Sequence, residues 1–342
     1  MKFIDNGDQT DPSLNLALEE YMLYHLNLTE PYLLFYINRP SIIIGRNQNA
    51  YEEVNLPYVN EHQLPVVRRL SGGGAVYHDL GNLNFSFLTR REGDSFRNFA
   101  RFTEPVVNAL RSMGVDAELK GRNDLQIGDK KISGNAQFST NDRMFSHGTL
   151  MFDVNAESVA SALRVNRIKM ESKGIKSVRS RVTNIRPHLA SDMSIQTFRD
   201  SLLKYIFEVS DVRNVPRVEL TDHDWGAIRE IHRQRYGNWH WNYGKSPAFN
   251  LKNVKRFDTG TVDVRLKVES GIIRHSKIYG DFFGMGDIFD VEKKLQNVPY
   301  ELGAVSAALQ GINLSSYFGD MDTDVFVQFL FGATSLSNEK QD

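Results

Sequence analysis

Apolar residues recur every three or four positions in several stretches of the chain, the spacing that gives an α-helix one buried face. This pattern predicts a helix over residues 13–26 and another over 96–113, where Gly114 is well placed to end it. Two more helices are predicted near 195–207 and 222–235. We expect each helix to pack its apolar face against other elements.

Shorter runs of β-branched and aromatic residues predict strands. Residues 33–38 and 41–46 are joined through 38–40, which includes a proline, so a hairpin is expected there. Gly128 and Asp129 tolerate the positive φ angles of a two-residue hairpin turn, which predicts a second hairpin. The full set of predicted strands in the first part of the chain is 33–38, 41–46, 66–70, 83–89, 124–127, 130–133 and 147–154.

Strands outnumber helices without a repeated β-α-β order, so the pattern favours an α+β fold over a doubly wound parallel sheet. The sheets should be mixed and mainly antiparallel, with helices packed on them. Turn-forming residues cluster over 237–249, and a hairpin centred on 270–271 is predicted within 262–280. We therefore expect a large domain over 1–246 and a smaller α+β domain over 247–342.

Composition narrows the possible functions. The 342 residues carry a net charge of −1, which gives no overall electrostatic case for nucleic-acid or membrane binding. The chain contains no cysteine, so disulfides, thiolate metal sites and cysteine nucleophiles are excluded. The N-terminus is polar and no stretch approaches the roughly 20 apolar residues that span a bilayer. These features predict a cytoplasmic protein.

The most distinctive segment is RRLSGGGAVYHDLGN, residues 68–82. Three consecutive glycines allow close approach of the backbone to a ligand and direct N–H groups at phosphate or carboxylate oxygens. A simple turn is an equally good interpretation of the segment taken alone. It is neither a Walker loop nor the dinucleotide pattern that opens a helix.

Two other segments carry candidate chemistry. Lys131 lies in 121–137 before a flexible Ser-Gly pair, and His147 stands beside a glycine in 145–150. A lysine near a turn is more often a solvated charge, and a histidine at the start of a strand is often a satisfied polar group. Neither segment identifies a function by itself.

The order and spacing of the three segments are far more specific than any one segment. Together the segments resemble the lipoate-protein ligase family, of the larger two-domain type, over nearly the whole chain. The resemblance implies a biotin/lipoate ligase-like catalytic domain and an accessory domain from about residue 249 to 331. It rests on IIIGRNQN (42–49), RRLSGGGAVYHD (68–79), KKISGNAQ (130–137), HGTL (147–150) and KGIKSVRSRVTNI (173–185).

The resemblance implies roles for residues at matching positions. Lys131, rather than Lys130, matches the lysine that contacts both the lipoate carboxylate and the adenylate phosphate, so it is the catalytic candidate. Tyr77 departs mildly from the family, where phenylalanine is common. The implied ATP and adenylate site comprises Arg69, Gly74, Ala75, Val76, Tyr77, Lys131 and Asp124. The implied lipoate site comprises Lys131, Gly73, Tyr36 and His147.

Asp124 is also the candidate metal ligand, because Mg²⁺ prefers carboxylate oxygens and is usually shared with nucleotide phosphates. A turn-forming aspartate is nearly as good an interpretation. The segment 170–185 is basic and rich in serine, which is typical of a surface loop, and it resembles the family's adenylate-binding loop.

The implied activity is ATP-dependent formation of lipoyl-AMP, followed by transfer of the lipoyl group to a specific lysine of an acceptor protein. ATP and lipoate are then substrates and Mg²⁺ a cofactor. The acceptors that the resemblance implies are lipoyl domains of 2-oxoacid dehydrogenase complexes and the glycine-cleavage H protein. Neither a nucleic-acid nor a membrane partner is expected.

Three alternatives remain to be weighed. An acyltransferase of the same fold that works through a cysteine thioester is excluded because the chain has no cysteine. A biotin-protein ligase is expected to carry a different glycine-rich loop. A non-catalytic lipoate-binding protein of the same fold stays open, and lipoate-dependent exchange between ATP and pyrophosphate would distinguish it from a ligase.

Overall fold

The computed structural model describes residues 1–163, 181–243, 251–269, 271–331 and 334–335. The chain separates into two compact units that are not continuous in sequence. The first consists of Met1–Ile44, Ala50–Arg69 and Ala75–Asn242, and the second of Gly45–Asn49, Leu70–Gly74 and Tyr243–Asp342. Most of the predicted basic loop 170–185 lies outside the described residues.

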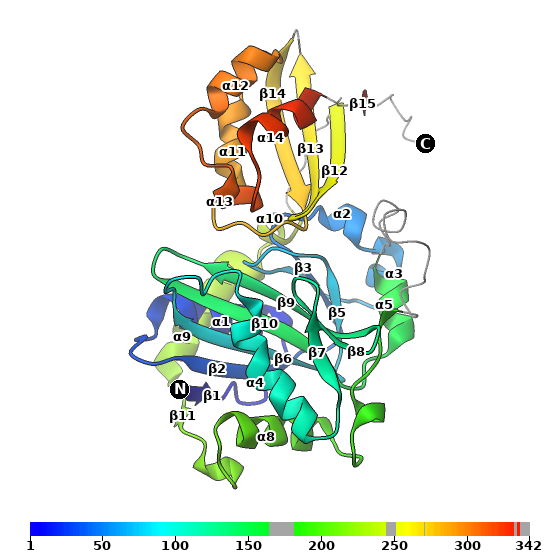
Figure 1. The fold of residues 1–342 in the computed structure, drawn as a ribbon, viewed down its shortest axis with the longest axis vertical. Helices are drawn as coiled ribbons and strands as arrows, with labels where there is room; N and C mark the ends of the chain where they lie inside the picture. The colour runs from blue at the N-terminus through cyan, green and yellow to red at the C-terminus, as the bar shows by residue number, and fades with distance from the viewer. Residues whose placement is uncertain (164–180, 244–250, 270, 332–333, 336–342) are drawn as a thin grey trace. The chain divides into compact units, whose positions relative to one another are not determined.

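The first unit is built on an eight-stranded mixed sheet (Figure 1). Three strands at one edge run parallel, and all later pairings are antiparallel. This arrangement confirms the predicted α+β class with mixed, mainly antiparallel sheets. In spatial order the strands are β11 (Arg217–Val218), β1 (Lys2–Ile4), β2 (Tyr32–Ile37), β6 (Asn82–Arg90), β10 (Arg143–Met151), β9 (Lys130–Ser139), β8 (Asp124–Ile127) and β7 (Ala117–Lys120).

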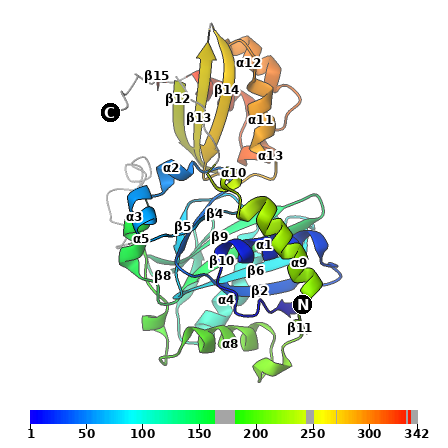
Figure 2. The same cartoon turned by 180° about the vertical axis from the view of Figure 1, so that it is seen from behind.

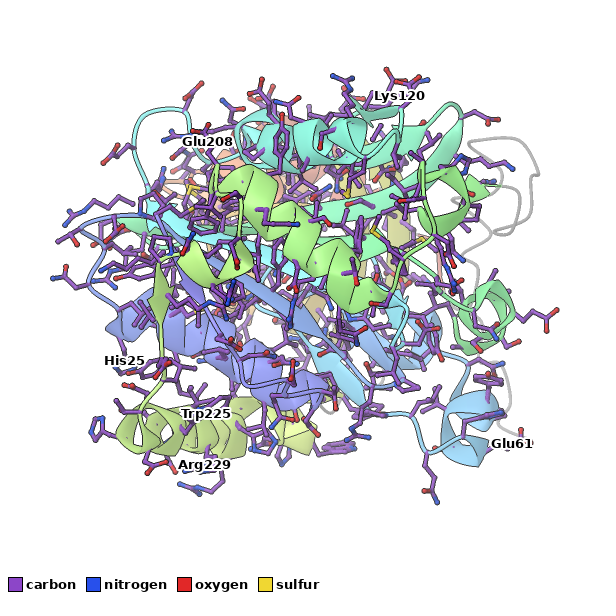
Figure 3. The ribbon with its side chains drawn as sticks, turned by 90° about the horizontal axis from the view of Figure 1, so that it is seen from below. His25, Glu61, Lys120, Glu208, Trp225 and Arg229 are labelled. Atoms are coloured by element: carbon purple, nitrogen blue, oxygen red, sulfur yellow. The ribbon has the colours of Figure 1, made fainter. Side chains whose placement is uncertain are left out.

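Helices cover both faces of this sheet (Figures 1 and 2). On one face α4 (Phe99–Ser112) and α8 (Ile195–Ile206) bury apolar residues in the main core. On the other face lies α1 (Pro12–His25), backed by α9 (Asp222–Ile231), and the Tyr21 hydroxyl donates a hydrogen bond to Asp224. In Figure 3, Trp225 and Arg229 of α9 lie at the bottom of the view and Lys120, at the end of β7, lies at the top.

The remaining helical elements of the first unit are short, and they connect or flank the sheets. None of the helices in the described ranges is long and apolar enough to cross a bilayer. These elements are α2 (Ala50–Glu53), α3 (Leu56–Glu61), α5 (Ala156–Ala162), η1 (Arg186–His188), η2 (Val212–Asn214), η3 (His232–Tyr236) and α10 (Trp239–Asn242).

A second, three-stranded sheet corrects one prediction. β3 (Ser41–Ile44) pairs with β4 (Val66–Arg68) and β5 (Val76–His78), not with β2. The hairpin expected between 33–38 and 41–46 is therefore wrong. The connecting residues are held by other parts of the chain: the Asn38 side chain is buried, and the Arg39 N–H donates to the Thr10 carbonyl at 2.8 Å.

Most other predicted elements are present. α1 and α4 match the periodic segments, and Gly114 follows α4 with a φ of 87°. β8 and β9 form the hairpin predicted at Gly128, whose φ is 60°. The two further helices and the strands that contain 66–68, 83–89 and 147–151 are also found.

The second unit contains a four-stranded antiparallel sheet packed against helices. A hairpin pairs β13 (Gly260–Glu269) with the edge strand β14 (Ile272–Gly280), as predicted from the turn at 270–271. The other strands are β12 (Leu251–Phe257) and β15 (Thr334–Ser335), and the helices are α11 (Ile288–Leu295), α12 (Leu302–Leu309), α13 (Ser315–Phe318) and α14 (Thr323–Phe331).

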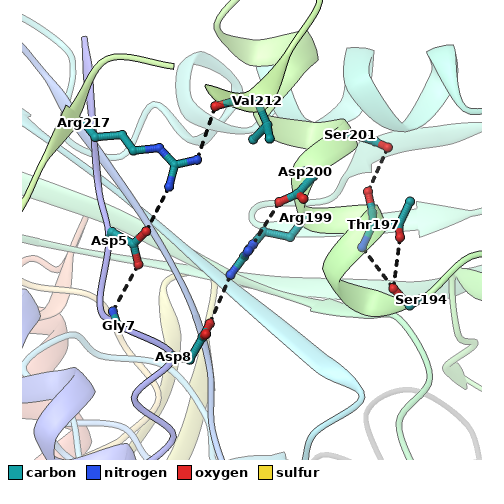
Figure 4. A network of polar contacts seen from close by, with 10 residues as sticks. All are labelled: Asp5, Gly7, Asp8, Ser194, Thr197, Arg199, Asp200, Ser201, Val212 and Arg217. Carbon is teal, nitrogen blue, oxygen red and sulfur yellow. Dashed lines mark hydrogen bonds and ion pairs between the residues drawn. The ribbon is translucent and has the colours of Figure 1, made fainter. Parts of the chain in front are cut away.

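Polar contacts fix the segment between β1 and α1 (Figure 4). Asp5 accepts from Arg217 of β11 at 3.0 Å and from the Gly7 N–H at 3.1 Å. Asp8 lies 3.4 Å from Arg199 of α8. These contacts are largely exposed, so they place the segment more than they stabilise the fold.

Candidate functional site

Lys131 stands at an irregularity in the β8–β9 hairpin. The register shifts between Leu125 and Gln126, and the Lys131 Nζ lies 2.8 Å from Asp124 Oδ1. The two side chains are 36% and 32% exposed, so the pair borders solvent without being fully open to it. The two sequence-predicted residues are therefore brought into direct contact, and Lys131 is held in one position by a neighbouring carboxylate.

Gly134, in the Ser-Gly pair after Lys131, lies next to the end of the lysine side chain. Gly134 lies opposite Asp124 in the register, and a Cβ added to Gly134 would fall 2.9 Å from the Lys131 Nζ. The atoms met are the movable end of the Lys131 side chain, so a larger residue at 134 would displace the ammonium group from this position but would not strain the backbone.

The described end of the basic segment lies beside Lys131. Val182 forms a parallel bridge with Lys131, and the Thr183 N–H donates to the Lys131 carbonyl at 3.0 Å. Residues 164–180, which precede Arg181, are outside the described ranges. Main-chain pairing therefore connects the candidate catalytic lysine with the C-terminal end of that segment.

A buried polar cluster occupies the same unit, on the sheet face under α1. His147 Nδ1 lies 3.0 Å from both carboxylate oxygens of Glu19, and the Tyr36 hydroxyl lies 3.5 Å from Glu19 Oε1. The exposures of Glu19, Tyr36 and His147 are 3%, 5% and 7%. Tyr36 and His147, both predicted from sequence, therefore share one partner, Glu19, which the sequence analysis did not identify.

The sequence contains a pattern from which the buried position of Glu19 could have been predicted. It lies four residues after Asn15 within a predicted amphipathic helix, so both polar residues fall on one side of that helix. Both are almost completely buried. Two polar residues at helical spacing beside an apolar stripe indicate a buried network.

Arg69 belongs to the same electrostatic environment. Burial lowers the pKa of its guanidinium to about 10, with Tyr36 and Glu19 opposing this shift and Arg68 adding to it. The group thus stays charged at neutral pH. Burial also raises the pKa of Tyr36 well above its usual value, with the Glu19 charge adding to the effect, so its hydroxyl remains a neutral donor.

Arg68 has a different role from its neighbour. Its Nε and Nη2 donate to the carbonyls of Trp241 and Asn242, each at 2.9 Å, and the Trp241 Nε1 donates back to the Arg68 carbonyl at 2.7 Å. Arg68 therefore fastens α10 to β4. Arg69, by contrast, interacts electrostatically with Glu19 and Tyr36.

The predicted adenylate residues divide between the two units. Ala75, Val76 and Tyr77 enter β5 in the first unit, and burial raises the pKa of the Tyr77 hydroxyl. Gly73 and Gly74 belong to the second unit.

Close packing within the second unit requires Gly72 and Gly45, and a positive φ favours glycine at position 73. A Cβ on Gly72 would lie 2.4 Å from the Phe282 carbonyl oxygen. A Cβ on Gly45 would lie 2.0 Å from the carbonyl oxygen of Gly73, whose φ is 93°. The loops 45–49 and 70–74 therefore touch through their backbones, and the Arg46 N–H donates to the Ser71 carbonyl at 2.9 Å.

Among the described residues, Asp124 does not belong to a cluster of side chains that could bind a metal ion without other ligands. Among the residues that the structure describes, no group of three or more histidine, aspartate or glutamate side chains could hold a metal ion. Mg²⁺ commonly takes only one or two protein carboxylates and completes its shell with water and substrate phosphates. The donor set fits a magnesium ion bound mainly through a nucleotide, and not a self-sufficient metal site.

Comparison with known proteins gives a consistent result. Residues 11–207 match the lipoyl protein ligase A/B catalytic domain, and 246–330 match the bacterial lipoate protein ligase C-terminus. The chain is 54% identical over 331 residues to the lipoate-protein ligase LplJ of Bacillus subtilis, covering 97% of this chain and 100% of that protein.

Two solved structures are similar to it. A structure from an archaeal lipoylation system, described as a bi-partite lipoate protein ligase and its E2 lipoyl domain from Thermoplasma acidophilum, is 30% identical with a TM-score of 0.62, covering 72% of this chain and 97% of that one. A lipoate-protein ligase A bound with ATP is 29% identical with a TM-score of 0.60, covering 71% and 98%. With matches at both ends of the chain and a relative aligned over its full length, this chain belongs to the lipoate-protein ligase family of enzymes.

Proposed function

We propose that the enzyme uses ATP to convert lipoate to lipoyl-AMP at Lys131, and then transfers the lipoyl group to a lysine of an acceptor protein. The observation that carries this proposal is the position of Lys131 beside Asp124, with the main chain of 182–183 paired to it. The family relation supports the reaction, and a similar ligase has been solved with ATP.

The first step needs alignment more than proton transfer. The carboxylate of lipoate is ionised at neutral pH, so its attack on the α-phosphorus of ATP requires the two anions to be held together. An ammonium group between them reduces their repulsion in the ground state and stabilises the charge that develops on the phosphate. Lys131 supplies that group, and the 2.8 Å contact with Asp124 holds it in place before substrates bind.

Arg69 and the glycine-rich segment complete the proposed nucleotide site. Arg69 provides a buried, permanently charged group, and Gly74, Ala75, Val76 and Tyr77 follow it in the chain. Asp124 would hold Mg²⁺ together with the phosphates, where the ion supplies charge neutralisation for the departing pyrophosphate. Release of Asp124 to such an ion would also free Lys131 for the substrate anions.

The polar cluster under α1 is the proposed end of the lipoate site, with Tyr36 and His147 facing the acyl chain. Burial protects the mixed anhydride from hydrolysis by water. In the transfer step, the positive charge of the site favours the neutral form of the incoming lysine amine, which is the nucleophile. No further general base is assigned.

The proposed acceptors are lipoyl domains of 2-oxoacid dehydrogenase complexes and the glycine-cleavage H protein. Support comes from the similar archaeal lipoylation system, which comprises a bi-partite lipoate protein ligase and its E2 lipoyl domain. We keep residues 1–246 as the proposed catalytic domain and 247–342 as the proposed accessory domain, and a cytoplasmic location as a prediction from the sequence.

The proposed function is tested by measuring adenylation of lipoate and transfer of the lipoyl group separately. Purified enzyme is incubated with ATP, Mg²⁺ and lipoate, and exchange of labelled pyrophosphate into ATP is measured. A panel of acceptor domains is then added and each is weighed by intact mass spectrometry. We expect lipoate-dependent exchange and a gain of one lipoyl group on at least one acceptor. Lipoate binding without exchange would instead identify a non-catalytic lipoate-binding protein.

A further inference from the structure

His78 is a buried residue that the proposed reaction has not yet used. It ends β5, directly after the proposed adenylate-binding residues 74–77, and is 4% exposed. Its Nε2 atom has no hydrogen-bond partner among the residues that the structure describes. An unpaired polar atom in a folded interior costs stability, so its presence calls for a functional explanation.

The contact made by the other ring nitrogen, Nδ1, determines whether Nε2 carries the ring proton. His78 Nδ1 lies 3.0 Å from the side-chain amide Nδ2 of Asn38, which can only donate. Nδ1 must therefore be the bare, accepting nitrogen, and the proton of the neutral ring must be on Nε2. The conclusion depends on the orientation of the Asn38 amide.

A relay of amides fixes that orientation, starting from a backbone carbonyl. The Gln9 carbonyl accepts from Asn15 Nδ2 at 2.9 Å, which orients the Asn15 amide unambiguously. The same Nδ2 then donates to Asn38 Oδ1 at 2.8 Å, so Asn38 must turn its own Nδ2 toward His78. Asn6 closes the relay by donating to the Gln9 carbonyl and to Asn15 Oδ1.

The members of the relay are buried, with exposures of 5% for Asn6 and 0% for Asn15 and Asn38. Buried amides that are each oriented by a neighbour form a rigid unit with one low-energy arrangement. The side chains of Asn6, Asn15 and Asn38 together keep the imidazole of His78 in one tautomer.

The surroundings of His78 indicate its ligand. The charged and titratable groups that act on it are Arg69 and His147. Glu19 contacts His147 and Tyr36, and both Glu19 and Tyr36 act on Arg69. Burial lowers the pKa of His78 to about 3, with Arg69 and His147 adding to the effect, so the ring is neutral at physiological pH. A neutral N–H beside a buried arginine is suited to an oxygen of an anionic ligand that Arg69 also attracts.

We propose that the Nε2–H of His78 donates a hydrogen bond to an oxygen of the bound acyl-adenylate, and that Asn38 and Asn15 are positioning residues that keep this nitrogen a donor. The inference rests on the proposed function and adds a donor to it. Because the tautomer is fixed before binding, the donor requires no proton movement when the substrate arrives.

The first experiment compares His78→Ala, His78→Gln and Asn38→Leu with the wild type. Two rates are measured: lipoate-dependent exchange of pyrophosphate into ATP, and transfer from synthetic lipoyl-AMP to an acceptor lipoyl domain. We expect His78→Ala to lower at least one rate about 100-fold, and His78→Gln, which keeps an N–H donor, to recover part of it. Asn38→Leu should lose about tenfold, as is typical when an orienting partner is removed. His223→Gln, at an exposed position, is the matched control.

The pH dependence separates positioning from a merely structural role. In Asn38→Asp, the new carboxylate accepts from Nδ1–H, so a neutral His78 ring presents a bare Nε2. The carboxylate also raises the pKa of His78, and protonation at low pH restores the Nε2–H. The ratio of variant to wild-type activity should therefore fall as pH rises through that pKa. A ratio that does not change with pH contradicts the proposal.

An NMR measurement on the wild type covers the case in which a variant fails to fold. The ¹⁵N resonances of the imidazole report which nitrogen carries hydrogen, and a non-hydrolysable lipoyl-adenylate analogue should shift the Nε2–H signal of His78. An Nδ1–H tautomer, or a signal unmoved by saturating analogue, would overturn the inference. If the wild type shows no exchange or transfer, the proposed function itself fails; an active wild type with unaffected variants rejects the role of His78 alone.

Discussion

The two faces of the eight-stranded sheet come from the same strands and bury different chemistry. Under α4 and α8, Phe35 and Phe85 are cross-strand partners within one apolar core. One residue further along β2, Tyr36 pairs with Asn84 on the face under α1, where Glu19 is also buried. Successive residues of a strand point to opposite faces, so a single strand contributes side chains to both faces of the sheet.

The apolar face of the sheet contributes stability, and the polar face holds the candidate chemical groups. Burial of an aromatic ring removes apolar surface from water and stabilises the fold directly. Burial of a carboxylate, an imidazole and an arginine gives no such gain and is tolerated only because the groups are paired. We infer that the apolar face holds the strands in place, which allows the polar face to keep reactive side chains in fixed positions.

The largest effect should come from the polar face and should concern activity alone. Lys131→Ala removes the proposed ammonium and should lower the rate of lipoate-dependent pyrophosphate exchange by about 10³-fold, because a preorganised charge is lost from the transition state. The thermal unfolding temperature should change little, since the lysine is partly exposed. Lys130→Ala, one residue earlier and exposed, is the matched control. Near-normal exchange in Lys131→Ala would remove the proposed role.

The next effect should come from the apolar face and should concern stability. Phe85→Ala should lower the free energy of unfolding by about 3–5 kcal/mol, because it leaves a cavity in the core. Ser86→Ala, at the adjacent buried position on the opposite face, should change it by no more than about 1 kcal/mol. Urea unfolding monitored by circular dichroism measures both. Equal losses from the two variants would contradict the proposed division between the faces.

A smaller effect should appear in the pH dependence of stability. The pKa of His78 falls to about 3 on folding from an ordinary value near 6.5, so the unfolded chain binds more protons between those values. Stability should therefore decrease as pH falls through this window, by about 1.4 kcal/mol per pH unit from this residue. His78→Gln lacks that contribution, and its free energy of unfolding should fall less steeply between pH 6 and 4. Parallel curves for the two proteins would show that His78 does not titrate this way.

The smallest effect should be found outside both faces. Arg217→Ala removes the exposed ion pair with Asp5 and should reduce the free energy of unfolding by less than about 1 kcal/mol. Added salt should narrow the difference further, because exposed charges are screened. A loss of several kcal/mol in the same urea experiment would mean that the N-terminal segment supports the sheet more strongly than its exposure indicates.

Local patterns predicted the elements better than their partners. α1, α4 and the β8–β9 hairpin follow from spacing and turn residues, because their hydrogen bonds join residues close in sequence. β2 and β3 are both apolar runs, and their sequences contain nothing that assigns them to different sheets. Pairing with distant strands decided that, together with the tertiary contacts of Asn38 and Arg39.

By itself the sequence determined the family, the α+β class and the candidacy of Lys131, because motifs and periodicities are properties of neighbouring residues. Only the tertiary structure showed that Glu19 joins Tyr36 and His147, and that Asn15 contacts Asn38 and Asn38 contacts His78. These residues come from separate parts of the chain. A hydrogen bond between them exists only once folding has excluded water and brought donor and acceptor within about 3 Å.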